Sequence, residues 1–136
     1  MSARSPDRVS RMFKAEPSSS EAARAFVELF LRNHHTSKNT VNDFLVVTSE
    51  LVTNAVTYGD GTPIEVSVDP DGWGIEVIGG HAAEGSYVLS PASWTMADRD
   101  KSSGRGLGIV RLLMSDIAAS IENGYVSIRC RYPQAG

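Results

Sequence analysis

The most constraining feature of this sequence is a change of hydrophobic period over a short distance. From Asn39 to Thr57, apolar side chains recur at spacings of three and four, which predicts one long amphipathic helix. The run 58–63 (Tyr-Gly-Asp-Gly-Thr-Pro) favours turns and ends this helix. From Ile64 to Asp69, apolar and polar residues alternate, which predicts a strand with one buried face. A helix followed at once by a one-faced strand indicates a helical layer packed on a sheet.

Two hairpins extend the predicted sheet. Residues 69–72 (Asp-Pro-Asp-Gly) form a turn, and the alternating segment 73–77 is the antiparallel partner of the first strand. Near the end of the chain, Asn123-Gly124 separates the segments 118–122 and 125–131. Asn-Gly between two alternating segments is the strongest short-range signal for a hairpin.

Two further helices and one short strand complete the expected elements. A strand is expected over 9–14. Ser18 followed by Glu21 fits a capping box, and the amphipathic helix that follows should end near 34–35. Another apolar helix is expected to begin near Arg105, with a glycine-rich first turn.

The resulting order is strand, helix, helix, strand, strand, long loop, helix, strand, strand. It predicts an α+β two-layer sandwich, in which a mixed, mostly antiparallel sheet is covered on one face by three helices. We expect a flexible tail over 1–8 and a single domain over 9–136. The stretch from about 79 to 104 shows no periodicity, and loops of this length are often functional, so a lid is expected there. Plain disorder, or a short helix over 91–97, is the alternative.

Composition excludes several classes of protein. The chain has 136 residues, with 13 Lys and Arg against 16 Asp and Glu, a formal net charge of −3. This balance argues against direct binding of nucleic acid, which normally requires a basic patch. No apolar run approaches the roughly 18 residues of a membrane span, and the polar N-terminus has no signal-peptide pattern. The single cysteine, Cys130, forms no internal disulfide and is expected to be a core thiol of a cytoplasmic protein.

The predicted helix over 39–57 carries a first pair of candidate site residues. Glu50 and Asn54 are four residues apart, so they lie one turn apart on the same face. The amide oxygen of Asn54 is a hard ligand that suits Mg²⁺. The carboxylate of Glu50 could accept a proton from an attacking hydroxyl. Solvated polar residues at the margin of a helix are the simpler interpretation of this pair.

The segment Gly104-Arg105-Gly106-Leu107-Gly108 is the second candidate. Glycines at the start of a helix let backbone N–H groups approach an anion, and the helix dipole favours phosphate at that end. A P-loop is excluded because Gly-Lys-Ser/Thr is absent. A dinucleotide fingerprint would require a preceding strand, which 94–103 does not resemble. A loop end that needs permissive backbone angles remains the alternative.

Together, the two candidate motifs are a more specific signal of function than either motif is alone. Glu-Leu-Val-Thr-Asn-Ala-Val at 50–56, a hairpin, a glycine-rich loop and Gly-Arg-Gly-Leu-Gly-Ile-Val at 104–110 follow one another in order. In this the chain resembles the GHKL ATPase superfamily over about residues 12–131. Its small size and the stretch 16–27 look most like the anti-sigma-factor serine kinases of bacterial partner switching.

The resemblance implies specific roles and two cofactors, ATP and Mg²⁺. Glu50 matches the acidic residue expected to act as general base or to orient water. Asn54 matches the asparagine that holds Mg²⁺ against the phosphates. The motif that closes over the phosphates corresponds to Gly104, Arg105, Gly106, Leu107 and Gly108.

One position departs from the family pattern. The family places an aspartate after the second hairpin strand, where it accepts a hydrogen bond from the adenine amino group, and here that cofactor-binding position holds Gly79. Loss of a charge-assisted hydrogen bond costs about 1.5–3 kcal/mol, which is roughly ten- to hundredfold in affinity. Glu76 or Glu84 could replace the missing carboxylate, and His81 could lie near the base.

The resemblance implies a cytoplasmic ATP-binding regulator that binds a sigma factor and phosphorylates a serine on an antagonist protein. It also favours a homodimer. A first alternative is a protein-binding module of the same fold that has weak or lost nucleotide binding, which Gly79 favours. A second is a histidine-kinase-type ATP-binding domain, which the absence of an upstream dimerising helix makes the weaker hypothesis.

Overall fold

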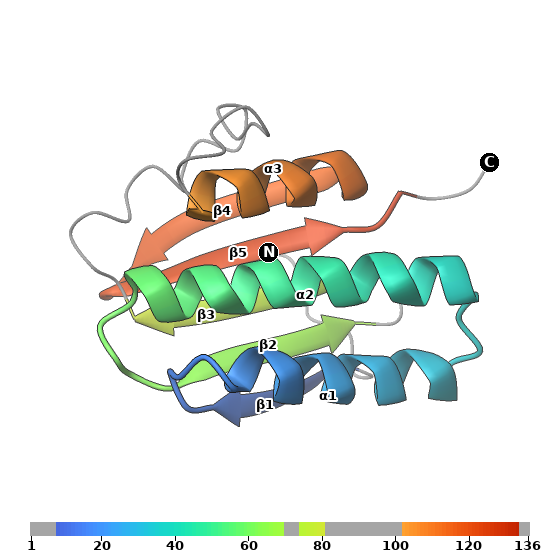
Figure 1. The fold of residues 1–136 in the computed structure, drawn as a ribbon, viewed down its shortest axis with the longest axis horizontal. Helices are drawn as coiled ribbons and strands as arrows, with labels where there is room; N and C mark the ends of the chain where they lie inside the picture. Colours follow the sequence, from blue (N-terminus) through green and yellow to red (C-terminus); the bar gives the residue numbers. More distant parts are fainter. Residues whose placement is uncertain (1–7, 70–73, 81–101, 134–136) are drawn as a thin grey trace.

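The computed structural model describes residues 8–69, 74–80 and 102–133. Its elements follow the predicted order (Figure 1), and they are β1 (Val9–Phe13), α1 (Ser19–Asn33), α2 (Lys38–Tyr58), β2 (Ile64–Asp69), β3 (Gly74–Gly80), α3 (Ser102–Leu113), β4 (Asp116–Glu122) and β5 (Tyr125–Arg131). Most of the expected lid, including the alternative helix over 91–97, lies outside the described residues. The two ends of the expected lid belong to β3 and α3, so the loop is shorter than predicted.

The five strands form one sheet in the order β1-β2-β3-β5-β4. All four pairings among the described strands are antiparallel, so the expectation of a partly parallel sheet is wrong. The reason is that α1 and α2 run antiparallel to each other between β1 and β2 (Figure 1), so the chain returns in the opposite direction to β1. Strands β2 and β3, and likewise β4 and β5, follow each other in the chain and are neighbours in the sheet. Strands β3 and β4 are not neighbours, because β5 lies between them.

The three helices cover one face of the sheet, as predicted (Figure 1). Strand residues alternate between the two faces, and the helix-facing set is buried in the same apolar cluster as α1, α2 and α3. This set includes Ile64, Val66, Val68, Ile75, Val77, Ile128 and Cys130. Cys130 is 1% exposed, which confirms the expectation of a core thiol, and its burial raises the pKa of the thiol to about 12.

The predicted hairpin at Asn123-Gly124 is confirmed. Both residues have positive φ, 52° and 82°, and β4 and β5 pair directly on either side of them. Positive φ at both central positions is the geometry of a type I′ turn, whose twist matches that of the flanking strands.

The start of α1 differs from the prediction. Ser18 has helical backbone angles (φ −65°, ψ −17°), and its side chain makes no capping hydrogen bond. A capping side chain normally requires an extended backbone at that position, so the predicted capping box is wrong. Instead, the Ser19 hydroxyl donates to the Lys14 carbonyl oxygen at 2.5 Å and ties the first turn to the loop after β1.

At α2 the cap is of the standard kind. Ser37 has an extended backbone (φ −61°, ψ 152°), and its Oγ accepts a hydrogen bond from the Thr40 N–H at 3.3 Å.

In the described parts of the chain we find no helical segment with the length and apolar character of a membrane span.

Because Ser37 caps its helix and Ser18 does not, replacing each serine by alanine should affect the stability of the fold differently. Ser37→Ala removes a capping acceptor and should lower the free energy of unfolding by about 1 kcal/mol. Ser18→Ala removes no cap and should change it by less than about 0.5 kcal/mol. Urea denaturation of both variants measures the difference. An equal loss in both would contradict the assignment of the caps.

Candidate functional site

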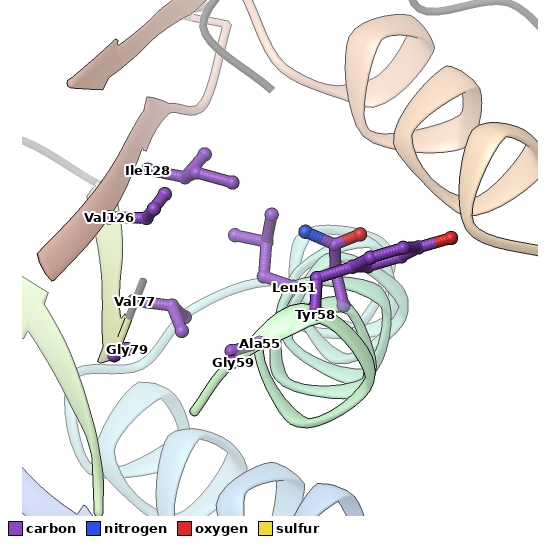
Figure 2. Close-up of a pocket in the computed structure, with 10 residues that line it drawn as sticks. Leu51, Ala55, Tyr58, Gly59, Val77, Gly79, Val126 and Ile128 are labelled. Carbon is purple, nitrogen blue, oxygen red and sulfur yellow. The ribbon is translucent and has the colours of Figure 1, made fainter. Parts of the chain in front are cut away.

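A pocket lies between the C-terminal half of α2 and the strands β3 and β5 (Figure 2). Figure 2 shows Val77, Val126 and Ile128 facing Leu51 across it. Its ten lining residues are Leu51, Asn54, Ala55, Tyr58, Gly59, Val77, Gly79, Gly80, Val126 and Ile128. The pocket therefore joins the end of the long helix to the end of the second hairpin strand.

The lining is mostly apolar, and the space inside is small. The cavity volume is about 20 Å³, which is room for about one water molecule. Because its walls are aliphatic, such a pocket would bind an aromatic ring mainly through burial of apolar surface.

Asn54 reaches this pocket, as its place on the predicted helix suggested. Its residue surface is 7% exposed, so it is buried more deeply than a solvated residue at a helix margin. Glu50 lies one turn earlier on α2 and is half-buried, but it does not line the pocket. The two side chains share a face of α2, while their roles toward Mg²⁺ and a proton stay predictions.

Gly79 lies in the pocket wall opposite α2. A Cβ atom at this position would lie 3.1 Å from the Cβ of Ala55 and 3.8 Å from Cγ1 of Ile64. Positive φ among the described glycines occurs at Gly61 and Gly124, so Gly79 is not required for backbone freedom. Its lack of a side chain lets α2 approach β3 closely.

Gly80 is constrained by space as well. A Cβ atom there would lie 1.7 Å from Oδ1 of Asp60. Asp60 belongs to the loop after α2, where its Oδ1 accepts hydrogen bonds from the N–H and the hydroxyl of Thr62 at 3.0 and 2.7 Å. The loop from α2 to β2 therefore packs directly on the end of β3.

The glycine-rich segment 104–108 lies within α3 and not before it. The helix begins at Ser102 and not near Arg105. Only the first four N–H groups of a helix lack an intrahelical partner, and of the three glycines only Gly104 belongs to them. Leu107 is fully buried in the core, so its side chain serves packing. The N–H groups of Gly106 and Gly108 would reach a phosphate only if the first turns of α3 unwound.

Glu76 does not replace the missing carboxylate. It lies on the sheet face opposite the pocket, where Arg8 and Ser127 donate hydrogen bonds to its two carboxylate oxygens. The suggestion that Glu76 could replace the carboxylate is therefore wrong, because the sequence alone does not indicate which face of the sheet the helices cover. His81 and Glu84 lie outside the described residues.

Several lining residues were missed by the sequence analysis. Tyr58 lies four residues after Asn54, and Leu51 and Ala55 flank Asn54 on the same side of α2. Helical spacing from Asn54 alone would have identified Tyr58. The two residues from β5 (Val126 and Ile128) could not be placed without the strand order, which brings β5 next to β3.

The described residues contain no group of three or more His, Cys, Asp or Glu side chains arranged to hold a metal ion. A single protein oxygen such as that of Asn54 fits Mg²⁺ that is otherwise bound by phosphates and water.

The chain is similar to a known domain family and to a solved structure. A model of the histidine kinase-like ATPase domain matches residues 13–131. Among solved structures, a chain in the crystal structure of the SiaB–SiaC complex from Pseudomonas aeruginosa is similar, with a TM-score of 0.65 at 18% sequence identity. The similarity covers 88% of this chain and 87% of that chain. A comparison with curated proteins finds no match.

The close approach at Gly79 predicts a measurable coupling. Gly79→Ala places a methyl group 3.1 Å from Ala55 Cβ and should destabilise the fold by about 1–2 kcal/mol through overpacking. In an Ala55→Gly background this added cost should largely disappear, because the opposing methyl group is gone. A double-mutant cycle in urea measures the coupling. Additive effects would show that space is not the reason for glycine at this position.

Proposed function

The chain belongs to the histidine kinase-like ATPase domain family, and on this premise we propose that it is an ATP-binding regulator of the partner-switching kind. ATP binds with Mg²⁺ in the pocket between α2, β3 and β5, and its γ-phosphoryl group is transferred to a serine of an antagonist protein. The observation that carries this proposal is the position of Asn54, a buried amide in the wall of an otherwise largely apolar pocket.

The residues of the pocket fit the two ends of the nucleotide. Leu51, Ala55, Val77 and Ile128 offer apolar surface to a base. Asn54 offers a neutral oxygen, which suits Mg²⁺ that is shared with phosphate oxygens. When bound, Mg²⁺ would neutralise charge that develops on the phosphates. The partner serine supplies the attacking hydroxyl.

Glu50 is the proposed general base. It lies one turn before Asn54 on the same face of α2 and outside the pocket lining, and in this proposal its carboxylate faces the γ-phosphate. In the transfer, a bond forms between the serine oxygen and the γ-phosphorus, and the bond from that phosphorus to the β–γ bridging oxygen breaks. The serine proton passes to Glu50, and ADP leaves.

The first turns of α3 are the proposed phosphate-closing segment. The free N–H groups at the start of a helix attract anions, and Gly104, Gly106 and Gly108 lower the cost of unwinding because glycine is a poor helix former. Nucleotide binding would then be accompanied by a local change from helix to loop at the start of α3. Leu107 limits this change, because its side chain anchors the helix in the core.

The proposed partners follow the family resemblance and the fold. The similar chain of known structure occurs in a complex of two proteins, SiaB and SiaC. We propose that this chain likewise acts through protein partners, namely a sigma factor and an antagonist that carries the target serine. A homodimer in the cytoplasm is the assembly that we expect.

A protein-binding module without nucleotide binding is the alternative function. Two observations favour it, since position 79 offers no carboxylate to the adenine amino group and the pocket holds about one water molecule. Calorimetric titration with ATP–Mg²⁺ and ADP–Mg²⁺ separates the two functions. Measurable binding of both nucleotides supports the regulator, whereas no heat and no saturation at millimolar nucleotide supports the module.

Asn54→Ala tests the proposed metal contact. Because the variant lacks the amide oxygen, it should bind ATP at least about tenfold more weakly in the presence of Mg²⁺, with a smaller change in EDTA. Thr53→Ala is the matched control, since Thr53 is the preceding residue of α2 and is exposed. Calorimetry with and without Mg²⁺ provides the comparison. If Asn54→Ala and Thr53→Ala bind ATP–Mg²⁺ equally well, the assignment of Asn54 is wrong.

Glu50→Gln tests the proposed base. Water can replace the serine hydroxyl as acceptor, so slow formation of ADP reports the chemical step without the partner. The variant should form ADP at least about a hundredfold more slowly, while its affinity for ATP changes only a few-fold, because a base acts in the transition state. Glu21→Gln, at an exposed position of α1, is the control. A parental rate in Glu50→Gln would remove Glu50 from the mechanism.

A further inference from the structure

Strand β4 forms one edge of the sheet and lacks the sequence features that usually protect an edge. Among the described strands it pairs with β5 alone (Figure 1). Its register with β5 runs without a bulge from Asp116 to Glu122, and the segment between them, Ile-Ala-Ala-Ser-Ile, contains no charge and no proline. Natural edges are usually kept from pairing with other chains by short length, charges, prolines or bulges. In sequence and length, β4 is therefore suited to receive a further strand.

The strand at the opposite edge, β1, is less suited. It is 5 residues long, against 7 for β4, and it carries a charge at its centre. That charge belongs to Arg11, whose guanidinium carbon lies 5.1 Å from the centre of the Phe26 ring. Short length and a central charge are two of the features that protect an edge, so the contrast selects β4.

The two faces of β4 differ in polarity. On the helix side, Ile117 packs against the core, yet both Ile117 and Ile121 remain half-buried. On the helix-free side, Ala118 and Ser120 are small and exposed, and they line a groove of about 320 Å³ that also includes residues of β3 and β5. A strand added to β4 would therefore cover the two isoleucines with one set of its side chains and place the alternate set beside the groove.

Arg129 gives this groove a positive charge. It is exposed, it lies directly opposite Ala118 in the pairing of β4 with β5, and it lines the groove. Within the described residues its side chain makes no hydrogen bond or ion pair. The carboxylate of the groove residue Glu76, by contrast, accepts hydrogen bonds from Arg8 and Ser127. Charge complementarity therefore favours an acidic group on whatever binds beside Arg129.

The spacing of the strands allows an added strand to reach Arg129. The backbone of a strand beyond β4 would lie two strand spacings, about 10 Å, from the backbone of β5. Only the methyl group of Ala118 stands between them at this position. The long side chains of an arginine and a glutamate can therefore meet over Ala118.

We propose that β4 binds an extended segment of a partner protein, which adds to the sheet as a further strand. Its apolar side chains cover the two isoleucines of β4, and a Glu or Asp among its alternate, polar side chains pairs with Arg129. In such strand addition, main-chain hydrogen bonds supply affinity and side chains supply specificity. Nucleotide is not required for this contact, because no described residue of β4 lines the pocket beneath α2.

A second copy of this chain is a poorer occupant of the same edge. If β4 paired with the β4 of another copy in antiparallel fashion about Ala119, Ser120 of one copy would lie opposite Ala118 of the other. A hydroxyl and not a carboxylate would then face Arg129, whose charge would remain unpaired.

Selection from a displayed library of random peptides tests the strand addition. Peptides of about twelve residues are long enough to pair along a strand of this length, and the whole chain without nucleotide is the target. Enriched peptides should alternate apolar and polar residues and carry Asp or Glu at a polar position. Binding of a selected peptide should slow hydrogen exchange of the β4 amides. The absence of enriched peptides, or binding that leaves exchange in β4 unchanged, would overturn the proposal.

Replacement of Arg129 tests the acidic contact. Arg129→Glu turns attraction into repulsion and should weaken binding of a selected acidic peptide at least about tenfold, whereas a peptide with Lys in place of its acidic residue should bind this variant well. Arg129→Gln, which avoids a second carboxylate beside Glu76, should weaken binding by about threefold or more. Arg131 also lies on β5 but outside the groove, so Arg131→Gln is the control and should change the affinity by less than about twofold.

Two results would contradict the proposed partner. Equal affinity of the acidic peptide for the parent, Arg129→Gln and Arg129→Glu would show that no carboxylate contacts Arg129. Sedimentation of the chain alone provides the second. If the chain self-associates through β4 and the peptides only compete with this association, the occupant is a second copy and the proposal is wrong.

Discussion

The packing of α2 on β2, β3 and β5 is the interaction on which the rest of the structure depends. The apolar face of α2 includes Phe44, Val47 and Leu51, which are all buried. Alternating branched residues of the strands belong to the same core. This contact fixes the end of α2 beside the end of β3, so Asn54 and Gly79 line one pocket although they are far apart in the chain. Gly79 sets the distance of the approach, since a side chain there would meet Ala55. The candidate site is thus a consequence of how closely one helix packs on one strand.

Periodicity predicted most of this architecture because the two layers bury one face each. The predicted helix over 39–57 and the predicted strand over 64–69 end within one residue of the observed α2 and β2. The predicted turn at Asn123-Gly124 has positive φ at both residues. The capping box failed because Ser18 and Glu21 have the right spacing but Ser18 has a helical backbone. Spacing specifies which residues could cap a helix, and the preceding loop decides which of them does.

The candidate site was predicted in part, and the remainder depends on the sheet order and on space. Asn54 and Gly79 share the pocket, as the family resemblance implied, but Val126 and Ile128 enter it only because β5 is inserted between β3 and β4. The start of α3 was placed too late because three glycines within a few residues favour a loop, whereas Leu107 and Val110 are buried and hold the segment as a helix. Tertiary packing here outweighs local propensity.

Strand β3 connects the two faces of the sheet, since its residues alternate between them. Val77 and Gly79 line the pocket beneath α2, while Glu76 and Ile78 line the groove on the opposite face. Glu76 and Val77 are adjacent residues of β3, yet one lines the groove and the other lines the pocket. Because β3 is paired with β2 and with β5, both surfaces are built on the central part of the sheet. Whether a residue of β3 belongs to the pocket or to the groove is thus decided by its place in the alternation of the strand.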